Sequence, residues 1–127
     1  MRNADKIIIG LHKTDKSPFE DYKFTKEEIS FINNVKNETN LTIVVFSKPY
    51  SMLDIDIDGI ESIIIAYQNS EIFQIKAAQA LFGAIDTKGV LPVSINQKIP
   101  VNTSIQLKKK KYSVLNITST KILSYQD

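Results

Sequence analysis

Three aspartates at alternate positions are the most conspicuous candidates for chemistry. Asp54, Asp56 and Asp58 precede Gly59, a spacing that imitates the first half of a calcium loop. Such a loop supplies oxygen ligands at alternate positions and a bidentate glutamate at its twelfth position. The twelfth position here is Ile65, inside an apolar run that predicts a strand rather than an exiting helix. We therefore interpret the segment as an acidic loop feeding a strand, and we expect no metal site.

Two further residues could take part in acid–base chemistry. His12 is the only histidine, and no Gly-x-Ser-x-Gly elbow accompanies it. A surface histidine is the preferred interpretation, although a Ser-His-Asp arrangement stays open. Glu71 opens an expected helix at the carboxyl edge of a parallel sheet, where ligands of such sheets bind. Glu71 is therefore a candidate for a residue of a substrate cleft. The simpler interpretation is that its charge complements the helix dipole. Glycoside hydrolysis would need a second carboxylate facing it.

Composition restricts the classes of function. The 127 residues suit one domain, and a formal net charge of +2 is too small to indicate nucleic acid or an anionic membrane as a partner. The absence of cysteine excludes disulfides and thiol catalysis. No glycine-rich phosphate loop follows any apolar run, so we expect no cofactor. No signal peptide is visible after Met1, which leaves the compartment open.

Apolar runs alternate with amphipathic segments along the chain. Strands are predicted at residues 6–11, 41–46 and 62–67, and a fourth at 91–95 whose Pro92 favours a sheet edge. Helices are predicted over residues 26–37 and 70–82. The alternation indicates an α/β fold with a doubly wound, mostly parallel sheet and helices on both faces, a flavodoxin-like three-layer sandwich. Residues 100–127 are interpreted as a Lys/Ser/Thr-rich tail or linker, with room for one edge strand at 112–117.

Local signals mark the ends of both helices. Thr25 and Glu28 form a capping-box pattern at the start of the first helix. Ser70 is the expected hydroxyl cap of the second. Gly83 is placed to adopt the left-handed conformation that ends it. Within the second helix, four residues share one side: Ile72, Ile75, Gln79 and Phe82.

Several short segments, in order, resemble a known family. They are Ser47-Lys48-Pro49-Tyr50, Ala66-Tyr67, Glu71, Ala77-Ala78, Leu81-Phe82-Gly83 and Gly89-Val90-Leu91-Pro92-Val93. Together they resemble the C-terminal α/β domain of family 3 glycoside hydrolases, over a domain spanning residues 1–99. Thr87-Lys88 departs from the Pro-Ser found in many members. The departures are more similar to the bacterial β-N-acetylglucosaminidase branch than to the large β-glucosidases.

The resemblance implies where the chemistry of the parent enzyme lies. The nucleophile of the family is an aspartate on an N-terminal catalytic barrel that this chain does not contain, so no catalytic residue is expected here. The domain would be an accessory domain that packs on that barrel and shapes its cleft. Some bacterial members continue into a serine hydrolase domain, and residues 106–127 would suit such a join. The parent could be secreted or periplasmic.

An accessory domain should carry an apolar face for its barrel. The candidates lie after the second and third strands: Pro49, Tyr50, Met52, Leu53 and Tyr67. The alternative is that these residues complete the domain's own core. The competing function is a free-standing flavodoxin-like module that binds a small molecule or a protein. Both functions fit the expected fold equally well.

Overall fold

The computed structural model describes residues 4–14, 21–117 and 120–126. The predicted strands and helices are confirmed, with boundaries that differ by no more than two residues, except for the fourth strand. The elements in chain order are β1 (Lys6–His12), α1 (Lys26–Glu38), β2 (Asn40–Phe46), the 3₁₀ turn η1 (Pro49–Met52), β3 (Ile60–Ile65), α2 (Glu71–Leu81), β4 (Lys111–Ile117) and β5 (Thr120–Gln126). Within the described residues, no helix has the length and apolar character needed to cross a membrane.

The first three strands form one parallel sheet in the order β1–β2–β3. Ile9 of β1 lies opposite Ile43 of β2, which lies opposite Ile63 of β3. The central strand β2 is buried from Leu41 to Phe46, as its largely apolar sequence predicts. The fold is therefore α/β, with an all-parallel sheet of three strands and two helices.

The two helices lie against opposite faces of this sheet. Side chains alternate between faces along a strand. On one face, residues of α1 pack on every second residue of β2, and on the other face α2 does the same. The first group contains Ile32, Val35, Leu41, Ile43 and Val45, and the second contains Val44, Phe46, Ala66 and Ala77. We call these faces the α1 side and the α2 side.

The helix ends follow the sequence signals in part. The Glu28 N–H donates to Thr25 Oγ1 at 3.2 Å and the Thr25 N–H donates to Glu28 Oε2 at 2.7 Å, which confirms the capping box. Gly83 has φ +69°, and its N–H donates to the Ala80 carbonyl while the Ala84 N–H donates to the Gln79 carbonyl. This pair of bonds is a Schellman motif, which closes α2 as predicted.

The fourth strand predicted at residues 91–95 is not formed. Leu91 instead exchanges backbone hydrogen bonds with Asn102 and Thr103, and the Ile95 N–H donates to the Ile99 carbonyl. The apolar residues are nevertheless buried, because Leu91, Ile95 and Ile99 pack into the α1-side core. Their burial explains the apolar pattern, while their hydrogen bonds go to a returning segment rather than to the sheet.

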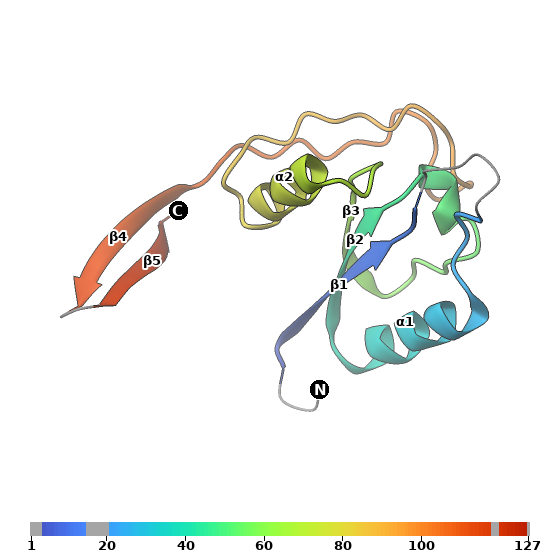
Figure 1. Ribbon diagram of the computed structural model, residues 1–127, viewed down its shortest axis with the longest axis horizontal. Coiled ribbons are helices and arrows are strands. Elements are labelled where there is room, and N and C mark those ends of the chain that lie inside the picture. The colour runs from blue at the N-terminus through green and yellow to red at the C-terminus, as the bar shows by residue number, and fades with distance from the viewer. Residues whose placement is uncertain (1–3, 15–20, 118–119, 127) are drawn as a thin grey trace.

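The expected tail also differs from the structure over its first half. Residues 84–110, here called the arm, run out and back, and Figure 1 shows its two halves side by side above α2. The Thr87 N–H donates to the Leu107 carbonyl at 2.8 Å, and the Lys110 N–H donates to the Gly83 carbonyl at 2.7 Å. The strand expected at 112–117 exists as β4. It pairs antiparallel with β5 in a separate hairpin and not with the parallel sheet, which corrects the expected edge strand.

Candidate functional site

The carboxyl edge of the sheet brings together residues that lie far apart in the sequence. The His12 ring stacks on the Phe46 ring, with centroids 4.5 Å apart and planes 15° from parallel. His12 Nδ1 lies 2.9 Å from Asn69 Oδ1, and Gln74 Nε2 donates to the same oxygen at 3.0 Å. Because an amide oxygen only accepts hydrogen bonds, His12 Nδ1 is the donor in this contact.

Gly10 makes room for this arrangement. A Cβ added at Gly10 would lie 2.9 Å from His12 Nε2 and 3.8 Å from the Phe46 ring. The histidine is exposed, as predicted, but its ring is held in one orientation by Phe46 and Asn69. Sequence reasoning missed Asn69 and Gln74 because they are polar residues distant from His12 with no motif around them.

A tight turn after β3 places Asn69 beside His12. The Ala66 N–H still bonds to the Val45 carbonyl at 2.8 Å, and then the Gln68 N–H donates back to the Ala66 carbonyl at 2.8 Å. Tyr67, at the centre of this γ-turn, has φ 65°. Such a conformation is strained for an aromatic residue, and strained backbone is often found at functional sites.

Glu71 and Ser70 begin α2 at the same edge. Glu71 is exposed in the first turn, where its charge complements the helix dipole. Ser70 occupies the N-cap position as predicted, but its side chain makes no cap hydrogen bond, which corrects the expected hydroxyl cap. Its Oγ is buried without a partner among the described residues. The described residues also contain no group of three or more His, Asp or Glu side chains placed to hold a metal ion.

The five residues proposed as an interdomain face have different environments. Met52 is fully buried in the α1-side core, so the alternative holds for this residue and the face rests on the other four. Tyr50 and Leu53 are exposed by 41% and 44%, whereas Pro49 and Tyr67 are half-buried.

A more extensive apolar surface lies on α2. Ile72, Ile75 and Phe82, which the sequence places on one side, are exposed by 58%, 47% and 65%. The opposite side of the helix packs on the sheet through Ala77, and Phe73 is half-buried. A small alanine allows the helix to approach the sheet closely. We call Ile72, Ile75 and Phe82 the α2 stripe.

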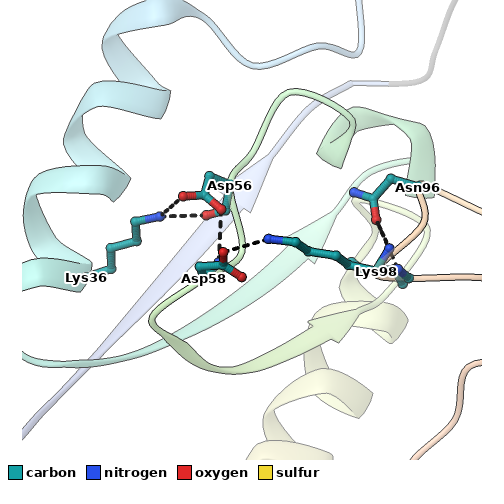
Figure 2. A network of polar contacts seen from close by, with 6 residues as sticks. Lys36, Asp56, Asp58, Asn96 and Lys98 are labelled. Atoms are coloured by element: carbon teal, nitrogen blue, oxygen red, sulfur yellow. Dashed lines mark hydrogen bonds and ion pairs between the residues drawn. The ribbon is translucent and has the colours of Figure 1, made fainter.

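The acidic loop forms ion pairs rather than a cage of oxygens. Lys36 Nζ donates to the Asp56 carbonyl oxygen at 2.8 Å and to Asp56 Oδ2 at 2.9 Å, and Lys98 Nζ lies 2.6 Å from Asp58 Oδ2 (Figure 2). Hydrogen bonding from Lys36, followed by the Asp58 N–H, lowers the pKa of the Asp56 carboxyl. The loop thus joins the end of α1 to the arm, where Asn96 Oδ1 accepts from the Lys98 N–H.

No family model, curated protein or solved structure matches this chain in the comparisons with known proteins.

Proposed function

We propose that this chain is an accessory α/β domain of a family 3 glycoside hydrolase, packing on the catalytic barrel through one of its faces. The α2 stripe is the observation that carries the proposal. A helix that is apolar on both sides is normally buried on both sides. Here only the Ala77 side is covered by the described residues, while Ile72 and Phe82 are in solvent. An interdomain interface of roughly 600–1,500 Å² would cover such a surface.

The segments that resemble the family have definite structural roles, and these roles are compatible with the proposal. Leu81-Phe82-Gly83 closes α2 and presents Phe82 at the end of the stripe. Ala66-Tyr67 makes the γ-turn at the carboxyl edge, next to the exposed Glu71. On this proposal the three strands belong to a doubly wound, flavodoxin-like domain. Glu71 lies at the rim of the barrel's cleft, and residues 106–127 join a following serine hydrolase domain.

The test combines the chain with the barrel of a β-N-acetylglucosaminidase-branch enzyme from which the C-terminal domain has been removed. We expect no hydrolysis of aryl N-acetylglucosaminide or aryl glucoside by the chain alone, and binding to the barrel in sedimentation experiments. The double variant Ile72→Lys/Phe82→Lys should weaken binding. Phe31→Lys, which changes an exposed aromatic residue on α1, is the matched control. Equal binding by both variants, or hydrolysis by the chain alone that requires one of its acids, would contradict the proposal.

A free-standing binding module is the second candidate, and the ordered His12 favours it. The His12 ring is held by Phe46 and Asn69 at the edge where α/β proteins bind ligands, and the strained Tyr67 follows β3 at the same edge. A ligand at this edge should shift the His12 ring resonances in an NMR titration with a small-molecule library. The variant Gly10→Ala should abolish those shifts because it displaces the ring. A library that moves no resonance near His12 would remove the basis for this candidate.

A further inference from the structure

The strand β1 is as apolar as a central strand, but it lies at the edge of the sheet. Ile7 and Ile9 pack against the α1-side core, and Ile8, on the other face, is 46% exposed. Among the described residues, only β2 pairs with β1. Exposed edges are normally protected by charges, prolines or bulges. Between Ile7 and Leu11 there is neither charge nor proline, and the β1–β2 register is unbroken.

The hydrogen-bonding groups at this edge can be assigned by alternation. In a parallel pair, the residues whose N–H and C=O face the neighbour alternate with residues whose groups face away. The Lys13 N–H donates to the Phe46 carbonyl of β2 at 3.3 Å, so the odd-numbered residues of β1 face β2. Ile8 and Gly10 therefore direct their N–H and C=O groups outward, where no described strand pairs with them.

We propose that β1 is a self-association edge, at which the β1 strand of a second copy of this chain pairs antiparallel across a two-fold axis. A two-fold axis perpendicular to the sheet makes the paired strands antiparallel and joins like face to like face. The result is one continuous sheet of six strands. This inference does not depend on the proposed function.

Self-complementarity of β1 selects the second copy as the occupant and fixes the register. With Ile9 opposite Ile9 of the second copy, Ile8 lies opposite Gly10, and their outward N–H and C=O groups bond in pairs. The His12 ring lies over Gly10, so Ile8 of the second copy would pack beside that ring. The same register sets Asp5 opposite Lys13, a residue of opposite charge whose ammonium also forms an ion pair with Glu28 of its own chain.

A single cysteine tests the register directly, because the natural chain contains none. Opposite residues at a non-hydrogen-bonded position of an antiparallel pair have Cα atoms about 4.5 Å apart, within the range of a disulfide. Ile9→Cys should therefore give a disulfide-linked dimer on mild oxidation. Phe31→Cys, at a more exposed position on α1, is a stringent control for random collision. The register is wrong if Phe31→Cys links as fast as Ile9→Cys.

A second experiment tests the edge itself by sedimentation of the unmodified chain and two lysine variants. The natural chain should dimerise as its concentration rises, and Ile8→Lys should weaken dimerisation by more than about tenfold because a charge then projects at the edge. Ile72→Lys changes the more exposed α2 stripe and should leave the dimer intact. Circular dichroism checks that both variants are folded. A monomeric natural chain, or a dimer broken by Ile72→Lys and not by Ile8→Lys, would overturn the proposal.

Discussion

The two faces of the sheet carry hydrophobic cores of different size. Within the described residues, the α1 side contains twelve buried hydrophobic residues in one cluster, drawn from the sheet, α1 and the segment before it, the β2–β3 loop and the arm. The cluster on the α2 side contains four. Ile8 of β1 and the α2 stripe remain in solvent on or above that second face. The difference indicates that the α1 side supplies most of the stability, whereas the α2 side leaves more apolar surface exposed.

The largest predicted effect tests this difference with one substitution made on each side. Ile43→Ala removes a fully buried side chain from the α1 side and should lower the free energy of unfolding by about 2–5 kcal/mol. Ile75→Ala, on the exposed side of α2, should change it by less than about 0.5 kcal/mol. Urea denaturation of the two variants measures both values. Similar losses would mean that α2 is stabilised through its outer side as well.

The next effect concerns the turn that attaches α2 to the arm. Gly83→Ala places a side chain at φ +69° and should destabilise the chain by about 1–2 kcal/mol. Gly89→Ala is the control, because a Cβ at Gly89 would have no neighbour within 4 Å. Thermal melting should separate the two variants. A Gly83→Ala protein as stable as the Gly89→Ala protein would show that the Schellman turn can relax.

The helix caps provide a smaller contrast between the two sides. Thr25→Ala breaks the capping box of α1 and should cost about 1 kcal/mol. Ser70→Ala should be neutral or slightly stabilising, because Ser70 Oγ caps nothing and is buried without a partner among the described residues. Urea denaturation shows which variant loses more stability, provided that the dependence of the unfolding free energy on urea has the same slope in both. A larger loss at Ser70 would reveal a hydrogen bond that forms in solution.

The smallest effect is a dependence on pH from Glu28, on the α1 side. Burial raises the pKa of this carboxyl, but the hydrogen bonds and charge of Lys13 and the bond from the Thr25 N–H outweigh it and hold the pKa below its ordinary value of 4.5. A carboxyl with a lowered pKa in the folded state stabilises the fold above its unfolded pKa and loses this contribution as pH falls through the folded pKa.

Glu28→Gln isolates that charge, because glutamine preserves the capping box. The variant should be less stable than the natural chain at pH 7, and the difference should disappear as pH falls through the pKa of the folded state, which lies below 4.5. Glu27→Gln, at the neighbouring acid in the first turn, is the control. A difference between Glu28→Gln and the natural chain that stays constant with pH would exclude the ion pair as its cause.

Periodicity and caps predicted the parallel sheet and both helices, because these signals act over a few residues. The same reasoning failed for residues 91–95, since an apolar pattern reports burial and not the partner of a backbone hydrogen bond. Leu91 is buried, but Asn102 and Thr103 take the place of a strand.

The candidate site was predictable to a lesser extent. The position of Glu71 at the start of α2 was predictable because Ser70 precedes it and the apolar residues 62–67 predict a strand before the helix. The contact between His12 and Asn69 spans 57 positions and depends on the γ-turn at Tyr67. No residue type requires such a turn, and the sequence therefore carried no signal for the side-chain cluster.

The hydrogen bond between Lys110 and Gly83 has a mechanical consequence for the end of the chain. Along the sequence, β4 begins twelve residues after the buried Ile99. A flexible linker of that length would let the hairpin move far from the rest of the chain. The bond returns the chain to the end of α2 at Lys110, immediately before β4 begins at Lys111. A pulling force applied to the hairpin would therefore act first on this bond and on the end of α2. The buried anchors Leu91, Ile95 and Ile99 would be loaded only after it breaks.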